Sequence, residues 1–503
     1  MREPPSLPLP QIDPATQPEF TDAAGAKAWL ADMPLANVAA AQHQLLAQLA
    51  ALNRCAVEAE DRLAALEALR EAVHFVQIEQ AKRFTQRALP MLPAESAVFD
   101  ATIALWEEMR LGYARCLQAQ AAPLRRQRAL LCQRALAYCG LRMFHHYRAY
   151  LEVPASDWRA LHEAYALAER LGVAEEPVKD YLNRDVHESS PRIAYLRAVL
   201  LAAAGPYELA PRQLTFVAYL LERWAERVAV SARPIDEGDL PPFAVDLAGD
   251  RGAARGPAQG GELRYLDTRR LAKSLRNRVA LLRKGESPAR LSLGEDCVQP
   301  SCEQLLVFLY RQWCQARPAR AAERTRANDT VQACTGFAAI HQLVAGAPPE
   351  SGLERWQLED ESALGLRMVC RASTPQGRLA HGQLVGLRAT GASALQLAHV
   401  RWLMTDAQGE LHCGLKLLPG LPQAAAVRGT GVNAAADRPV PAFCLSAVPA
   451  LKAPASLVVP PGWFRPRRVI ELARDGGSAG VHLLEVLERG ADFERLAYES
   501  AAA

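Results

Sequence analysis

The stretch WQLEDESALGL, residues 356–366, alternates apolar and polar side chains and contains a glycine next to its end. This alternation predicts a β-strand in which Asp360 and Ser362 share a face with Leu358. Two polar side chains then interrupt an apolar row that faces inward, and burying each without a partner would cost about 1–3 kcal/mol. Their partners are either local backbone groups, in a turn before a bulge at Gly365, or a bound molecule.

Two pairs of β-compatible runs follow this stretch. The runs at residues 395–404 and 410–418 flank the turn sequence TDAQG, and the runs at 467–474 and 479–487 flank the turn sequence DGGS. Turn residues between two such runs are typical of β-hairpins. The last third of the chain is therefore predicted to be mainly β.

The first part of the chain has a different periodicity. Residues 23–230 are rich in Ala, Leu, Arg and Glu, and apolar residues such as Leu63, Leu66 and Leu69 recur at steps of three and four. This spacing predicts amphipathic helices separated by proline and glycine breaks, with one long helix over residues 124–153. An antiparallel helical array or an irregular solenoid is the natural packing of such helices.

A mixed segment connects the two parts. Residues 232–261 are rich in Pro, Gly and Asp, which marks a boundary or a long loop. Within this segment we expect a strand at residues 242–247, and after it a basic amphipathic helix at 267–282 and a second helix at 303–315.

Composition excludes several classes of protein. The 503 residues carry 58 Lys and Arg against 55 Asp and Glu, so no global field attracts the chain to nucleic acid or to an anionic membrane. No window reaches the ~18 apolar residues that a membrane helix needs. Residues 1–20 contain six prolines and no apolar core, which indicates a disordered lead and not a secretion signal. We therefore expect a cytoplasmic protein without membrane insertion.

The sequence contains none of several common signatures of enzymes and metal sites. The sequence has no phosphate-binding loop ending in Lys-Ser or Lys-Thr, no zinc-protease histidine pair and no Gly-x-Ser-x-Gly elbow. The GTGVNA sequence at residues 429–434 lies between β segments and is interpreted as a linker. Eleven scattered cysteines indicate reduced core residues, and Cys297 with Cys302 lacks the second pair that a zinc site requires. The sequence thus predicts no catalysis, no cofactor and no metal.

A local cationic segment precedes residues 356–366 in the sequence. Five arginines lie within sixteen positions and are opposed only by Glu323, while Pro318 interrupts any helix there. An extended connector of this kind can close over an anionic ligand. The five are Arg311, Arg317, Arg320, Arg324 and Arg326.

Together, the two segments resemble the ligand signature of the PilZ domain, a family of bacterial β-barrel receptors for cyclic di-GMP. That signature is Arg-x-x-x-Arg followed some tens of residues later by Asp/Asn-x-Ser-x-x-Gly. The first half is matched by Arg320 and Arg324, although Arg317 and Arg326 offer other registers, and the second half by residues 360–365. Segments at 382–387, 399–403 and 413–418 resemble later strands of the family, so the resemblance covers about residues 317–427.

The resemblance implies a role for each matched residue. Arg320 and Arg324 would grip guanine and phosphate, because a guanidinium can fork onto phosphate oxygens or onto guanine O6 and N7. Asp360 and Ser362 would hold the polar edge of the other guanine, and Gly365 would let the backbone approach the ligand closely. Nucleic acid fits less well, because the β segment lacks a set of aromatics on which bases would stack.

We therefore predict a multidomain α+β signalling protein that binds cyclic di-GMP and a protein partner, the latter through residues 21–230. The alternative is a non-enzymatic interaction scaffold whose barrel binds no nucleotide. The predicted order is a disordered tail at 1–20, a helical array or solenoid at 21–230, a mixed α/β connecting domain at 231–316, a PilZ-like antiparallel β-barrel at 317–428 and a small β-rich unit at 429–503.

Overall fold

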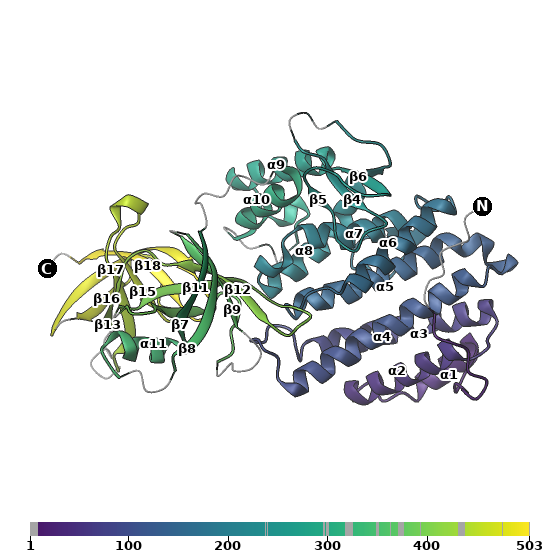
Figure 1. Ribbon diagram of the computed structural model, residues 1–503, viewed down its shortest axis with the longest axis horizontal. Helices are drawn as coiled ribbons and strands as arrows, with labels where there is room; N and C mark the ends of the chain where they lie inside the picture. Colours follow the sequence, from purple (N-terminus) through teal and green to yellow (C-terminus); the bar gives the residue numbers. More distant parts are fainter. Residues whose placement is uncertain are drawn as a thin grey trace. The chain divides into compact units, whose positions relative to one another are not determined.

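The computed structural model describes residues 9–236, 238, 240–294, 297, 301–316, 325–348, 352–362, 364–370, 377–392, 394–430, 438–474 and 476–501. The chain forms two compact units (Figure 1), one of Met1–Gln86 with Met91–Ala319 and one of Arg87–Pro90 with Arg320–Ala503. The first is mainly helical and the second mainly β, which confirms the predicted α+β class. Across the described residues, no helix combines the length and the apolar character needed to span a lipid bilayer.

The first unit begins with an array of helices, and the predicted periodicity is confirmed because Leu63, Leu66 and Leu69 are all buried. The long helix predicted over residues 124–153 is wrong in its bounds. A 3-10 turn covers Ala122–Gln127, and the following helix ends before Tyr150, whose φ of 54° is left-handed. The helices are α1 (Ala23–Ala31), α2 (Val38–Arg54), α3 (Ala59–Ala81), α4 (Pro93–Gln118), α5 (Arg128–Arg148), α6 (Ala155–Arg170), α7 (Pro191–Ala203) and α8 (Pro211–Trp224).

A buried charge network fastens the loop between α6 and α7 to the array. Asp180 lies after the short strand β1 (Val178–Lys179), which pairs with β2 (Glu188–Ser189). Its carboxylate accepts a hydrogen bond from Arg70 at 2.8 Å and lies 3.4 Å from Arg134. Burial acts to raise the pKa of Asp180, but the two arginines outweigh it and lower the pKa to about 2.

The mixed segment packs on the end of this array. Its sheet has the order β3-β6-β4-β5, of which the sequence predicts only the strand at residues 242–247, and the two predicted helices follow it. The helices pack against each other, and their apolar residues join the core of α5 to α8. The elements are β3 (Ala229–Ser231), β4 (Phe243–Asp246), β5 (Ala254–Arg255), β6 (Leu263–Asp267), α9 (Arg269–Arg283) and α10 (Ser301–Cys314).

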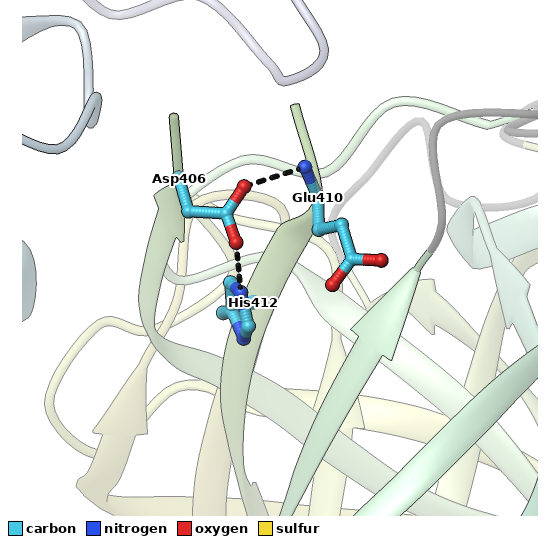
Figure 2. Close-up of side chains that lie close together, drawn as sticks. All are labelled: Asp406, Glu410 and His412. Atoms are coloured by element: carbon cyan, nitrogen blue, oxygen red, sulfur yellow. Dashed lines mark hydrogen bonds and ion pairs between the residues drawn. The ribbon is translucent and has the colours of Figure 1, made fainter. Parts of the chain in front are cut away.

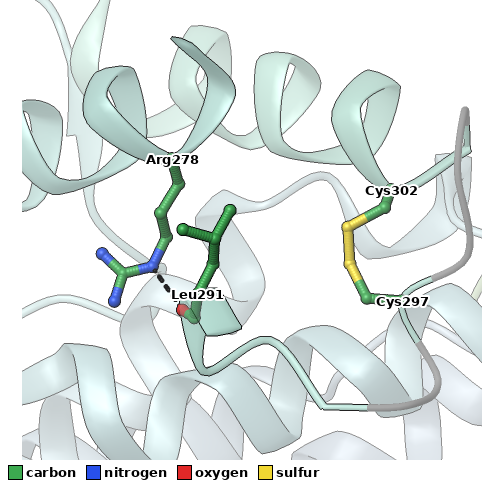
Figure 3. The surroundings of a disulfide bond; sticks show 4 residues. All are labelled: Arg278, Leu291, Cys297 and Cys302. Atoms are coloured by element: carbon green, nitrogen blue, oxygen red, sulfur yellow. Dashed lines mark hydrogen bonds between the residues drawn. A yellow bond between two sulfur atoms is a disulfide. The ribbon is translucent and has the colours of Figure 1, made fainter. Parts of the chain in front are cut away.

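The connection between α9 and α10 is fastened at two points (Figure 3). Arg278 of α9 donates a hydrogen bond to the carbonyl of Leu291 at 3.1 Å. Cys297 and Cys302 form a disulfide, with their Cα atoms 5.1 Å apart. The prediction that all cysteines are reduced is therefore wrong for this pair. The other nine cysteines, all of which lie within the described residues, form no disulfide.

The second unit contains two closed six-stranded barrels. The first comprises β7 (Thr325–Thr335), β8 (Glu354–Ser362), β9 (Gly365–Cys370), β10 (Leu384–Ala389), β11 (Gln396–Thr405) and β12 (Leu411–Leu417). The second comprises β13 (Pro422–Gly429), β14 (Val440–Leu445), β15 (Ser456–Val459), β16 (Val469–Arg474), β17 (Gly477–Arg489) and β18 (Glu494–Ser500).

The two barrels have the same topology. The first runs β7-β8-β9-β12-β11-β10 before closing on β7, and the second runs β13-β14-β15-β18-β17-β16 before closing on β13. Both predicted hairpins are confirmed, as β11 with β12 and β16 with β17. The C-terminal β-rich unit is itself a complete barrel, because the strand Pro422–Gly429 closes it.

The barrels share an apolar junction. Phe443, Leu445 and Val458 of the second barrel form one buried cluster with residues of the first barrel, including Leu384 and Leu397. The helix α11 (Phe337–Val344) contributes Ile340, which is fully buried there.

Ion pairs also link the two barrels at this junction. Glu488 of β17 lies 2.8 Å from His399 of β11 and 2.6 Å from Lys416 of β12. Burial acts to raise the pKa of Glu488, but these two partners outweigh it and lower the pKa to about 2.

A short segment from the α3–α4 connection belongs to the same unit. Leu89 and Leu379 exchange two backbone hydrogen bonds, at 2.7 and 2.8 Å. The side chain of Arg378 donates to the carbonyls of Ala88 and Pro90. The helical array thus supplies one piece of backbone to the barrel unit.

Candidate ligand site on the first barrel

The hairpin of β8 and β9 carries the second half of the predicted signature. Ser362 and Gly365 face each other as the last paired residues of the hairpin, and Asp360 is half-buried on β8. Arg320 and Arg324 lie outside the described residues. The neighbouring strand β7 begins at Thr325, directly after them in sequence, and its Arg326 is in register with Asp360.

A β-bulge corrects the predicted face of these side chains. Leu358 pairs with Met368, but Asp360 pairs with Arg367, so Glu359 is an extra residue on β8. Paired residues share a face, and the bulge reverses the alternation. The prediction that Asp360 points inward with Leu358 is therefore wrong, because Asp360 lies with Arg367 on the outer face of the barrel.

The same outer face carries a cation stacked on an aromatic ring. Arg367 of β9 is in register with Gly414 of β12, which in turn pairs with Trp402 of β11. The guanidinium carbon of Arg367 lies 5.8 Å from the centre of the Trp402 ring, a cation–π distance. The indole lies against Gly414, where any Cβ atom would collide with it.

Further charges flank this row. The side chain of Arg367 forms an ion pair with the bulged Glu359 at 2.6 Å and keeps 40% of its surface exposed. A second bulge lies between Val400 and Trp402, so the exposed Arg401 stands beside Trp402 opposite Gly414. The outer row therefore offers a ring face, cations and a carboxylate, which is a suitable set for a nucleotide with phosphate groups.

Two of the predicted residues have local structural roles. The hydroxyl of Ser362 donates a hydrogen bond to the carbonyl of Gly365 at 3.1 Å, which agrees with the turn interpretation for this side chain. The hydroxyl oxygen of Ser362 can still accept a hydrogen bond from another donor. Gly365 lies so close to the carbonyl of Leu415 on β12 that a Cβ atom would collide with it. Its lack of a side chain is thus explained by strand packing.

The end of the β11–β12 hairpin holds a cluster of Asp406, Glu410 and His412 (Figure 2). The carboxylate of Asp406 accepts hydrogen bonds from the backbone N–H groups of Gln408 and Glu410, and from Nε2 of His412 at 2.8 Å. Burial acts to raise the pKa of Asp406, but these donors lower it overall. The carboxylate of Asp406 thus stabilises the hairpin turn.

A separate cleft of about 670 Å³ lies in the first unit, between α6 and β6. Its charged lining residues are Glu169, Arg170, Glu262 and Arg264, of which Arg264 and Glu169 form an ion pair at 2.6 Å. Since two acidic and two basic residues line the cleft, it carries no net charge that would attract a phosphate group.

The sequence alone does not identify Arg367, Arg401 and Trp402 as candidate site residues. Only their pairing across the bulged strands brings them together with Asp360. The one available signal was the tryptophan beside Arg401 in a run of β-compatible residues, which by itself does not indicate an outward-facing ring.

The segments on either side of this barrel are similar to domains of known proteins. Residues 23–234 match the family described as the cyclic-di-GMP receptor FimW, N-terminal domain, and residues 425–501 match the FimW C-terminal beta-barrel domain. The cyclic-di-GMP receptor FimW of Pseudomonas aeruginosa is 28% identical over 336 residues, which are 64% of this chain and 53% of that protein. The chain thus matches about half the length of this curated relative, and its first barrel lies between the two matched domains.

Proposed function

We propose that this protein is a cytoplasmic, non-enzymatic signalling receptor that binds cyclic di-GMP on the outer face of its first barrel. The observation that carries the proposal is the outward row of Asp360, Arg367 and Trp402, beside the strand that follows Arg320 and Arg324 in the sequence. The resemblance to PilZ receptors and the similarity to two domains of a cyclic-di-GMP receptor both support this ligand.

The chemistry of the row suits a guanine and a phosphodiester. Arg320 and Arg324 supply cations for phosphate oxygens and for guanine O6 and N7. Asp360 accepts from the N–H groups of a guanine edge, while the Trp402 ring offers a stacking surface for the base. Arg367 already stacks on this ring and lies on the same face as the Asp360 carboxylate. Its side chain can therefore turn from the ring to a phosphate oxygen of the bound ligand.

Signalling then requires that ligand binding at the first barrel change the conformation of other parts of the chain. The arginine segment continues α10 in sequence, so drawing it onto the barrel would bias the position of that helix. The helical array at residues 21–230 is the proposed binding surface for a downstream protein. Cyclic di-GMP is then expected to protect residues 317–329 from proteolysis.

Calorimetric titration of the full chain tests the proposal. We expect cyclic di-GMP to bind with micromolar or tighter affinity, and Arg324→Ala and Asp360→Ala to abolish measurable binding. The neighbouring exposed Glu361, which pairs with Leu366, provides the matched control Glu361→Ala and should keep wild-type affinity. Loss of binding in the control alone, or unchanged binding in both site variants, would contradict the assignment of the site.

The second candidate is a scaffold whose barrel binds no nucleotide. It is favoured by the Ser362 hydroxyl, which the hairpin itself already uses. A titration without heat, on protein whose circular dichroism shows the native fold, would support the scaffold and exclude the receptor.

A further inference from the structure

The helix α9 is the most one-sided cationic element of the mixed segment. Its sequence RRLAKSLRNRVALLR contains six basic residues, no acidic residue and no aromatic residue, and Lys284 follows at its C-terminal end. Its apolar side chains Leu271, Leu275 and Leu282 are buried against the rest of the unit. In Figure 1, α9 runs alongside α10 at the periphery of the helical unit.

The exposed side of α9 carries cations without partners. Arg270, Lys273, Arg276 and Lys284 are exposed, and they recur at helical spacing on the side opposite the buried leucines. Within the part of the chain that the structure describes, none of the four forms an ion pair or a hydrogen bond through its side chain. The neighbouring Arg269 and Arg283 are paired, with Asp267 at 2.6 Å and Glu303 at 2.7 Å.

This arrangement does not stabilise the helix itself. Basic residues in the first turn, such as Arg270, oppose the helix dipole. Like charges three or four residues apart, as Lys273 is from Arg270 and Arg276 from Lys273, repel each other on a helix surface. A complementary anionic partner would relieve both effects.

We infer that the exposed face of α9, defined by Arg270, Lys273, Arg276 and Lys284, binds an acidic helical segment of a protein partner. Glutamates at three- and four-residue steps on such a segment match the spacing of these cations. The two arginines fork onto carboxylates with two parallel hydrogen bonds, and clusters of arginine are a recurring means of recognising acidic motifs. The small Ala280 and the partly exposed Leu281 lie next to the cations and give the face an apolar contact of its own.

Two other polyanions fit the same observations less well. An anionic membrane would need a second anchoring signal, because an electrostatic contact of this size holds proteins only weakly, and the apolar side of α9 is buried in the protein. A nucleic acid would find no ring on which to stack on this helix.

The test uses the full chain and an alanine-based helical peptide that carries four glutamates at three- and four-residue steps. We expect fluorescence anisotropy to detect binding that weakens with added salt. The charge-reversal variant R270E/K273E/R276E/K284E should weaken it about tenfold or more. The matched control K27E/R125E/R126E/R465E makes the same change in net charge at exposed sites elsewhere and should change the affinity by less than about twofold.

The inference is overturned if the control variant loses as much affinity as the α9 variant, since only net charge would then matter. It is also overturned if a peptide of the same composition with its glutamates in one contiguous block binds equally well. Vesicles of phosphatidylcholine and phosphatidylglycerol, and a duplex DNA, complete the experiment. If the vesicles or the DNA bind more tightly than the peptide, and binding depends on the α9 cations, the partner of this face is a membrane or a nucleic acid and not an acidic protein segment.

Discussion

The two barrels follow the same strand order and yet use the corresponding strands in opposite ways. In the first barrel, β8 and β9 present Asp360 and Arg367 outward. In the second barrel, the corresponding strands β14 and β15 are buried on both faces. Their inner face fills that barrel, while Phe443, Leu445 and Val458 form the junction with the first barrel. A shared topology therefore does not imply a shared site.

The local cause of the difference is the bulge in β8. The extra Glu359 places two adjacent acidic side chains on the outer face, whereas β14 pairs with both its neighbours without any shift of register. A regular strand would have turned Asp360 into the apolar interior. One inserted residue on β8 thus explains why this strand presents a candidate recognition surface, whereas β14 presents a packing surface.

The largest expected effect is on the packing face of the second barrel. Phe443→Ala should lower the free energy of unfolding of β14 and β15 by about 3–5 kcal/mol, because this fully buried ring contacts Phe337 and His341. Native-state hydrogen exchange on the full chain measures this loss. On the corresponding strand of the first barrel, Glu361→Ala should cost less than about 0.5 kcal/mol. Similar losses of free energy of unfolding in the two variants would contradict the difference between β14 and β8.

The next effect depends on pH and concerns the junction of the barrels. The pKa of Glu488 is lowered to about 2, so its contribution of about 3 kcal/mol is fully present above about pH 4.5 and declines as the pH falls toward 2. Calorimetric melting should therefore show a difference in stability between wild type and Glu488→Gln that narrows as the pH falls from about 4.5 toward 2. A gap that stays constant down to about pH 3 would show that the ionised carboxylate does not hold the junction.

A smaller effect separates two arginine–tryptophan pairs, one on the strands of the first barrel and one in the β15–β16 connection of the second barrel. Each barrel has an arginine over a tryptophan, Arg367 with Trp402 at 5.8 Å and Arg468 with Trp463 at 5.1 Å. Trp402→Ala should weaken binding of cyclic di-GMP by about 1–3 kcal/mol, because a stacking surface is lost. Trp463→Ala removes the matching pair from the second barrel and should leave the affinity unchanged. Equal losses in titration would mean that the ring of the first barrel has no special role.

The elements that could be predicted from the sequence are those fixed by local pattern. The periodicity of residues 23–230 predicts the helices, and the turn sequences TDAQG and DGGS predict the hairpins, because their residues favour tight turns. The sequence also predicts that Asp360 and Ser362 interrupt a strand with polar side chains, and the structure places both on the hairpin of β8 and β9.

The remaining features depend on pairing between strands and could not be predicted. The bulges at Glu359 and Arg401 are visible only in the register with the neighbouring strand, and they decide which side chains reach the outer face. The second barrel closes through the strand Pro422–Gly429, whose alanines carry little β propensity. The disulfide between Cys297 and Cys302 depends on the spatial approach of two cysteines in a connection whose fold the local pattern does not specify.

The smallest expected effect decides what the hydroxyl of Ser362 does in the hairpin of the first barrel. It donates to the carbonyl of Gly365, so Ser362→Ala should lower the free energy of unfolding of the hairpin by about 0.5–1.5 kcal/mol. Thr390 is the matched control, since its hydroxyl donates to the carbonyl of Thr330 in the same barrel, away from the hairpin. Thr390→Val should cost a similar amount in native-state hydrogen exchange.

The affinity for cyclic di-GMP then distinguishes the two interpretations of Ser362. If the hydroxyl also accepts a hydrogen bond from the ligand, Ser362→Ala weakens binding by several-fold, while Thr390→Val does not. If the hydroxyl serves only the turn, both variants lose stability and neither loses affinity. The second result would remove Ser362 from the site but retain Asp360, whose position on the outer face is set by the bulge at Glu359 and does not depend on the turn.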